Sequence, residues 1–196
     1  MTSKSDEIKV QQWVATCERG FESLLKAELL AFGADDIDTK MQALTFSGSL
    51  EVALRTCLWS RVALRVLKPI LSFNAKDTDS LYDGARSIIW QDHFSLDSTF
   101  AIDVACKRAV ITNSHFASLR VKDGIVDYFL DAQGERPSVA VKEPDVKVFL
   151  FLDDDEGTLS IDLSGDSLHR RAYRSGTGEA PIKEHLAAGM LMLSGH

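Results

Sequence analysis

The sequence predicts a mixed α+β fold built from two small units that follow one another along the chain. At 196 residues the chain is long for one compact domain and short for two large ones. Segments of alternating polar and apolar residues are interspersed with segments in which apolar residues recur at helical spacing. Hydrophobic residues make up 45% and charged residues 26% of the chain, which is enough apolar material for a buried core.

Residues 1–73 are expected to form the first unit. Its predicted elements are a strand over Val10–Cys17, a helix over Phe21–Phe32 ended by Gly33, two short strands over Ile37–Met41 and Ala43–Phe46, a helix from the Gly48-Ser49 cap through Trp59, and a strand over Arg61–Ser72. The order β-α-β-β-α-β is that of a ferredoxin-like unit, with two helices on one face of an antiparallel sheet.

Residues 74–166 are expected to form the second unit. Its predicted elements are a helix capped near Asp77 that runs through Trp90 to about Asp92, a strand over Ser98–Ala105, a long helix capped at Thr112-Asn113-Ser114 and closed by Gly134, and a hairpin of Lys147–Leu152 and Thr158–Leu163. The acidic turn Asp153–Gly157 joins the two hairpin strands. In residues 167–196, a basic stretch and a glycine-containing segment lead to an apolar helix from Pro181 through Leu193, which is expected to pack on a domain that follows.

The sequence has no apolar run near the roughly 20 residues of a membrane helix and no signal-peptide pattern, so a cytoplasmic location is expected. Cys17, Cys57 and Cys106 are widely spaced within apolar patterns and are predicted to be buried free thiols. The histidines do not fall at short zinc-ligand spacings, and no metal site is predicted.

The net charge of −7 argues at first against a nucleic-acid partner, but the charge is unevenly distributed. Residues 151–166 carry a net charge of −6, whereas residues 167–196 carry +2. Basic residues lie just after the end of one predicted strand and on the helix that follows it. A second cluster comes after the hairpin. Together with the amino-terminal turn of that helix, they suit contacts to phosphate. The candidate RNA-binding residues are Lys107, Arg108, Asn113, His115, Arg120, Lys122, Arg170, Arg171 and Arg174.

Two short motifs suggest other chemistry. Gly165-Asp166-Ser167-Leu168 has the signature of one esterase class, but that class places its aspartate and histidine far downstream, and a turn leaving the hairpin is favoured instead. Gly176-Thr177-Gly178 is a fragment of a phosphate-binding loop that follows no strand and lacks a third glycine, so it is interpreted as a hinge. For His115, an exposed histidine without a role is more common than one that contacts phosphate or a base.

Three stretches resemble one protein family, the bacterial 23S rRNA guanine-N2-methyltransferases. The stretches are Ala15–Leu25, Ile111–Asp127, and Asp162–Arg174 followed by Ala180–Ala188. The first is similar to the family's opening strand and helix, and the second to the helix of its THUMP domain. The third is similar to the passage that joins THUMP to the catalytic domain.

The resemblance implies that a ferredoxin-like unit and a THUMP domain bind structured 23S rRNA and present a guanine to a downstream methyltransferase domain that uses S-adenosylmethionine. The family's aspartate-led, glycine-rich cofactor loop and its Asn-Pro-Pro-Tyr-type motif do not occur in this sequence. No catalytic or cofactor-binding residue is therefore assigned, and the chain by itself is expected to be non-catalytic. The alternative is a structural or interaction module that docks the catalytic domain or a second subunit.

Overall fold

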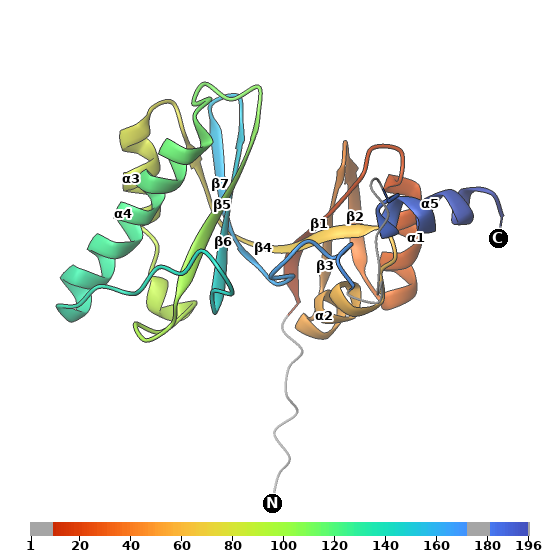
Figure 1. Ribbon diagram of the computed structural model, residues 1–196, viewed down its shortest axis with the longest axis horizontal. Coiled ribbons are helices and arrows are strands. Elements are labelled where there is room, and N and C mark those ends of the chain that lie inside the picture. The colour runs from red at the N-terminus through yellow and green to blue at the C-terminus, as the bar shows by residue number, and fades with distance from the viewer. Residues whose placement is uncertain (1–9, 172–180, 196) are drawn as a thin grey trace, which may run out of the picture. The chain divides into compact units, whose positions relative to one another are not determined.

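The computed structural model describes residues 10–171 and 181–195 (Figure 1). The chain divides into two compact units: one holds the residues up to Leu67 together with those from Asp166 onward, and the other holds Lys68–Gly165. Strand β4 (Ala63–Asn74) contributes its first residues to one unit and the rest to the other. The α+β class expected from the sequence is confirmed.

The first unit has the strand order β2-β3-β1-β4. It contains β1 (Gln11–Cys17), α1 (Glu22–Phe32), β2 (Asp35–Lys40), β3 (Ala43–Gly48), α2 (Leu50–Trp59), the start of β4 and α5 (Glu184–Leu193). β1 is antiparallel to β3 and to β4. This spatial order and the β-α-β-β-α-β sequence order are those of the ferredoxin-like unit predicted above.

Local signals in the sequence explain where the helices of the first unit begin and end. Gly33 takes the left-handed conformation, with φ of 92°, that ends α1 and that glycine adopts without steric cost. The Ser49 hydroxyl accepts a hydrogen bond from the amide of Val52 and caps α2. α5 begins at Glu184 rather than at Pro181, because Lys183 is still extended.

Glu28 is a buried carboxylate that joins α1 to the turn between α2 and β4. It accepts hydrogen bonds from the Ser60 hydroxyl at 2.6 Å and from Arg61 Nε at 2.9 Å, and its side chain is 6% exposed. These hydrogen bonds stabilise the negative charge of the buried carboxylate. The helical pattern of the sequence did not single out this residue, because its partners lie more than 30 positions away.

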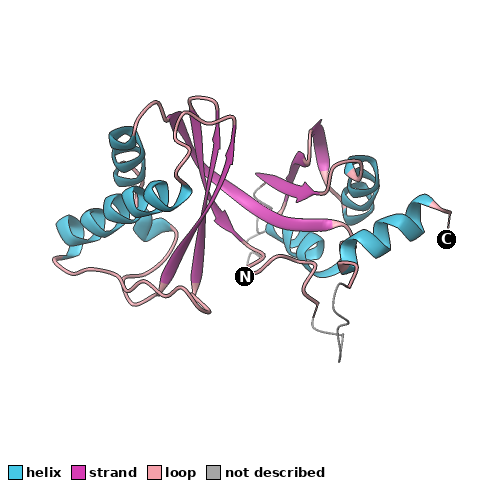
Figure 2. Cartoon of the chain, turned by 45° about the horizontal axis from the view of Figure 1, so that its top comes forward, coloured by secondary structure: helices cyan, strands magenta, loops and turns pink. Residues whose placement is uncertain are grey.

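The second unit has the strand order β4-β7-β6-β5, with helices α3 and α4 on one face of the sheet (Figures 1 and 2). Its elements after β4 are α3 (Thr78–Arg86), a 3-10 turn (Trp90–Asp92), β5 (Phe100–Lys107), α4 (Ser114–Gln133), β6 (Val146–Asp153) and β7 (Glu156–Asp162). β5 and β6 are parallel and are connected through α4, whereas β6 and β7 form an antiparallel hairpin. Trp90, Phe94, Phe100 and Phe129 form an aromatic cluster in the core between sheet and helices.

Three expectations for the second unit need correction. The first helix ends at Arg86 instead of continuing through Trp90, because the Trp90 indole donates to the Ala85 carbonyl and turns the chain back onto the core. The hairpin strands run further than expected, so that Asp154 and Asp155 alone make the turn. Of the three cysteines expected to be buried, Cys106 is exposed and Cys57 is half-buried, whereas Cys17 is buried and burial raises the pKa of its thiol to about 12.

Candidate nucleic-acid interface

Lys107 and Arg108 lie at the carboxyl end of β5, beside the acidic hairpin turn. Lys107 Nζ is 3.2 Å from Asp153 Oδ2, and Arg108 Nη2 is 3.2 Å from Asp153 Oδ1. Burial opposes the ionisation of Asp153, but the hydrogen bonds from Lys107 and Arg108 outweigh it and hold the pKa of Asp153 below its ordinary value. Both cations thus have carboxylate partners with which a phosphate would compete.

The amino-terminal turn of α4 carries no acidic side chain of its own. The Asn113 side chain accepts from the amide of Phe116 at 3.0 Å, which makes it the helix cap. The first turn contains no acidic residue, and His115 is exposed there. Unpaired amides and the helix dipole at such a turn favour an anion.

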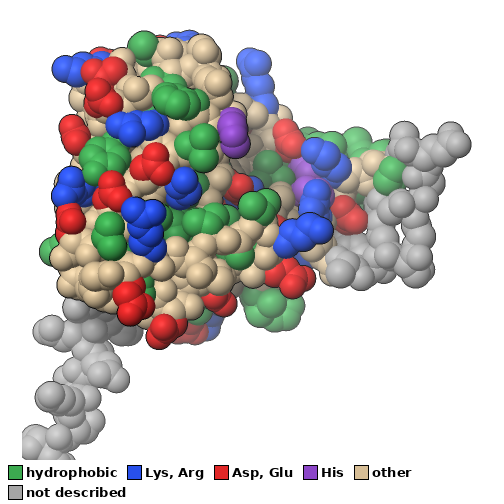
Figure 3. All heavy atoms as spheres, turned by 60° about the vertical axis from the view of Figure 1, so that its left-hand side comes forward, with side chains coloured by type: hydrophobic (Ala, Val, Ile, Leu, Met, Phe, Trp, Pro, Cys, Tyr) green, Lys and Arg blue, Asp and Glu red, His purple; other side chains and the backbone are tan. Residues whose placement is uncertain are grey.

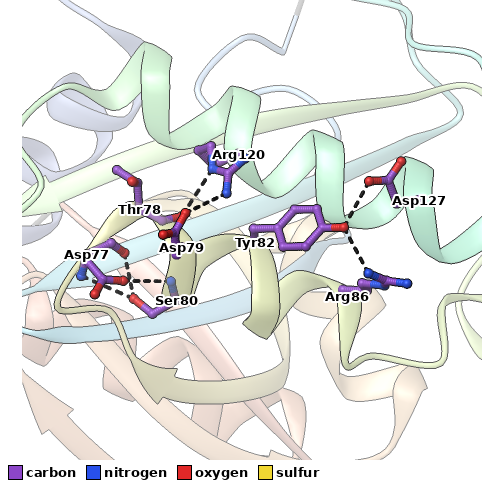
Figure 4. A network of polar contacts seen from close by, with 8 residues as sticks. All are labelled: Asp77, Thr78, Asp79, Ser80, Tyr82, Arg86, Arg120 and Asp127. Carbon is purple, nitrogen blue, oxygen red and sulfur yellow. Dashed lines mark hydrogen bonds and ion pairs between the residues drawn. The ribbon is translucent and has the colours of Figure 1, made fainter.

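Arg120 is held between α3 and α4 in a polar network (Figure 4). Its Nη2 atom lies 2.9 Å from Asp79 Oδ1, its Nε donates to the carbonyl of Thr78, and its guanidinium lies 5.0 Å from the ring centroid of Tyr82. The side chain is 26% exposed. These contacts give Arg120 a structural role that its place on a basic helix face did not indicate.

Tyr82 continues the same network toward the other end of the helices. Its hydroxyl donates to Asp127 Oδ2 at 2.9 Å and accepts from Arg86 Nη1 at 3.1 Å (Figure 4). The hydrogen bond to Asp127 raises the pKa of Tyr82 above its usual value. Neither Tyr82 nor Arg86 was among the candidates from the sequence, although their spacing of four on one helix was a local sign that they are neighbours.

Lys122 lies next to a hollow of about 520 Å³ on the helical face of the second unit. Lys122 Nζ is 3.1 Å from Asp123 Oδ1, and Arg120 and Arg136 also line the hollow. Across the face that carries α3 and α4, lysine and arginine side chains are interleaved with aspartate and glutamate (Figure 3). This face therefore offers separate cations rather than one basic stripe.

The candidate arginines after the hairpin differ in their hydrogen-bond partners. Arg171 donates from Nη1 to the carbonyls of Cys57 and Leu58 and from Nη2 to the carbonyl of Ser60, so its guanidinium caps the carboxyl end of α2. Arg170 is exposed, and its side chain has no hydrogen bond or ion pair within residues 10–171 and 181–195. Arg174 lies outside the described residues.

Ser167, the candidate hydrolase nucleophile of the Gly165–Leu168 motif, lies near a histidine. Its hydroxyl is 2.8 Å from His169 Nδ1, but the nearby Glu18 carboxylate contacts His185 Nε2 at 3.1 Å instead. A nucleophile–base pair of this kind needs the carboxylate on the base itself. The turn is the better interpretation of this motif.

Within the described residues, no three His, Cys, Asp or Glu side chains are grouped so that they could hold a metal ion. Across the same residues, no helix is long and apolar enough to cross a membrane.

Comparison with protein families identifies both units. Residues 12–67 match the family described as the RlmL ferredoxin-like domain, and residues 75–162 match the THUMP domain. The chain combines an RlmL-type ferredoxin-like domain with a THUMP domain.

Curated relatives of this two-domain chain carry the same name. The ribosomal RNA large subunit methyltransferase K/L of Syntrophotalea carbinolica is 46% identical over 94% of this chain, and that of Cellvibrio japonicus is 44% identical over 95%. The chain spans about a quarter of the length of these relatives.

Solved structures agree with the fold. A predicted N6-adenine-specific DNA methylase from Listeria monocytogenes is 31% identical, with a TM-score of 0.79 over 94% of this chain and 48% of its own. SMU.472, a putative methyltransferase complexed with SAH, is 27% identical, with a TM-score of 0.77 over 94% of this chain and 49% of its own.

Proposed function

We propose that this chain binds structured RNA of the large ribosomal subunit, 23S rRNA, and presents a guanine to a methyltransferase domain in a longer protein. The THUMP match over residues 75–162, together with relatives named for large-subunit rRNA methylation, is the observation that carries the proposal. The transfer itself is N2-methylation by a domain that uses S-adenosylmethionine, which is in keeping with the SAH complex of the structural neighbour SMU.472. The chain contributes binding and orientation, not catalysis.

The candidate phosphate contacts differ in the partners that their side chains already have. Arg170 and the amino-terminal turn of α4, with Asn113 and His115, are open to a phosphate. Lys107, Arg108, Arg120 and Lys122 each have a carboxylate partner that would compete with a phosphate. Structured RNA suits such dispersed contacts, because a folded RNA is recognised by its shape and backbone.

The test is binding of the 196-residue chain to a 23S rRNA fragment from the peptidyl-transferase region, against a scrambled RNA, at several salt concentrations. Each phosphate contact contributes about 0.7 to 0.9 to the slope of log affinity against log salt. We expect Arg170→Ala to lower this slope by about one contact. Arg55→Ala is the matched control, because Arg55 is an exposed arginine that pairs with Glu51 on α2 and is not among the candidate contacts. Equal affinity for both RNAs, or no binding at low salt, would contradict the proposal.

A second candidate function is a docking module for the catalytic domain or for another subunit. The apolar residues Ile182, Met190, Leu191 and Leu193 of the last segment are each at least 50% exposed, which favours a protein contact there. Self-association in light scattering without preferential RNA binding is the result that distinguishes this function.

A further inference from the structure

The ferredoxin-like unit contains a small pocket of its own. It is a cavity of about 280 Å³ bounded by the carboxyl end of α2, the 168–171 segment and the first turns of α5. Leu58, Trp59, Leu168 and Ala188 supply apolar walls, and His169 and His185 supply polar ones. Apolar walls with a few convergent polar groups are typical of a site for a small flat group.

The two arginines at this pocket are already engaged by the protein. The Arg171 guanidinium donates to three carbonyls, and Arg61 Nε donates to the buried carboxylate of Glu28 at 2.9 Å. Both Nη atoms of Arg171 are therefore occupied, so Arg171 has no open fork for a phosphate, and Arg61 is paired through Nε. Glu184 also lines the pocket and Glu28 pairs with Arg61, so carboxylates offset the two arginines, and an uncharged part of an RNA chain suits the pocket better than a phosphate.

Trp59 provides an aromatic surface for such a group. Its side chain is 65% exposed, whereas Trp13 and Trp90 are at most 1% exposed. One exposed apolar residue needs no explanation by itself. This indole, however, adjoins a cavity with two imidazoles, and exposed aromatic rings are the usual platform for unstacked bases of RNA.

The two histidines provide polar atoms for a base edge. His185 is 2% exposed, its Nε2 lies 3.1 Å from Glu18 Oε1, and its Nδ1 has no hydrogen-bond partner within the described residues. The His169 ring packs against it at a tilt of 59°, with the ring centroids 5.3 Å apart. A buried ring nitrogen without a partner is costly in a folded protein unless a ligand or a rearranged neighbour satisfies it.

We propose that this pocket binds one unpaired nucleobase of RNA, with the base stacked on Trp59 and its polar edge toward His169 and His185. The proposal rests on the function proposed above, since it assigns a second RNA site to the same chain. The THUMP unit would then contact folded RNA, while the ferredoxin-like unit holds a single-stranded nucleotide.

The exposed indole makes the site directly measurable. The 196-residue chain is titrated with short single-stranded oligoadenylate and oligouridylate while tryptophan fluorescence is recorded, because Trp59 is the accessible indole. Stacking contributes about 1–3 kcal/mol per base, so Trp59→Ala is expected to weaken oligonucleotide binding by roughly 5- to 150-fold. His169→Ala is expected to weaken it too and to change the preference between the two oligonucleotides.

Leu54→Ala is the matched control, since Leu54 lies on the same helix, is 50% exposed and does not line the pocket. Binding of the 23S rRNA fragment is measured in parallel for every variant. If the rRNA fragment binds but oligonucleotides leave the fluorescence unchanged, or if Trp59→Ala and Leu54→Ala bind them equally, the pocket proposal is overturned and the proposed function stands. If the oligonucleotides quench Trp59 but the rRNA fragment is not preferred over scrambled RNA, the pocket stands and the proposed function fails.

Discussion

Gly124 sets the distance between α3 and α4, and its replacement by alanine tests whether that distance is fixed. A methyl group on Gly124 would lie 2.6 Å from the carbonyl oxygen of Tyr82 and 2.9 Å from Cβ of Ala85. An ordinary contact needs roughly 3.5 Å, so the helices would have to separate by about 0.9 Å. Overpacking of this kind costs about 1–3 kcal/mol, and the obstruction is backbone, which places Gly124→Ala at the upper end.

Alanine is also the better helix former, and it recovers about 1 kcal/mol relative to glycine. The expected net loss of stability is therefore about 2 kcal/mol, close to a 30-fold change in the opening equilibrium. The separation would also strain the bridges from Tyr82 to Asp127 and from Arg120 to Asp79, which hold the two helices together.

Hydrogen exchange followed by mass spectrometry measures this effect in one unit at a time. Peptides from α3 and α4 should exchange about 30-fold faster in Gly124→Ala, while peptides from α1 in the same sample keep their wild-type rates. Gln133→Ala on the exposed end of α4 is the control for helix propensity without crowding. Amide exchange in α3 and α4 at or below the wild-type rate would refute the reasoning. The helix propensity of alanine would then outweigh the steric crowding by its methyl group.

Two further predictions concern the ferredoxin-like unit and the response to pH. Arg171→Ala should lower the free energy of unfolding of that unit by about 1.5–3 kcal/mol in denaturant titrations, since three carbonyls lose a charged donor. Arg171→Lys should restore little of this free energy, because an ammonium lacks the planar, forked set of donors of a guanidinium. Burial lowers the pKa of both His93 and His169 below the unfolded value near 6.5. Lys68 lowers the pKa of His93 further, and His185 lowers that of His169, both by smaller effects. The unfolded chain therefore binds more protons than the folded chain as the pH falls through that value. The melting temperature should therefore decrease between about pH 7.5 and 5.5, and the decrease should be smaller in a His93→Gln, His169→Gln double variant; an equal decrease in that variant would contradict the assignment.

Local signals in the sequence were sufficient for most of the fold. Asp77, Asn113 and Gly134 mark helix ends by chemistry that acts within four residues, and the structure places helix ends at each of them. The order of strands and helices in the first unit was likewise enough to indicate the ferredoxin-like arrangement. Errors occurred where a long-range contact overrides local periodicity, as where the Trp90 indole bonds to the Ala85 carbonyl.

The candidate interface was harder to predict, because the state of a basic side chain depends on partners distant in sequence. Arg120 pairs with Asp79 across 41 positions, and Lys107 pairs with Asp153 across 46. No pattern within a single helix or strand reveals such a partner. The sequence grouped Arg170 and Arg171 as candidates but could not show that Arg171 is enclosed by carbonyls whereas the Arg170 side chain has no partner among the described residues.

This distribution of charge bears on how an acidic chain can recognise RNA. Where a candidate cation is paired with a carboxylate, as Lys107, Arg108, Arg120 and Lys122 are, a phosphate competes with that partner, and the net electrostatic gain is smaller than for a free lysine or arginine. Long-range attraction is also weak for a chain of net charge −7. We therefore expect a modest salt slope, set by Arg170 and the start of α4, with much of the affinity supplied by contacts that salt does not screen. A base stacked on Trp59 is a contact of that kind, so loss of the indole should lower RNA affinity at every salt concentration without changing the slope. A parallel fall in slope would mean instead that Trp59 acts by orienting nearby phosphate contacts.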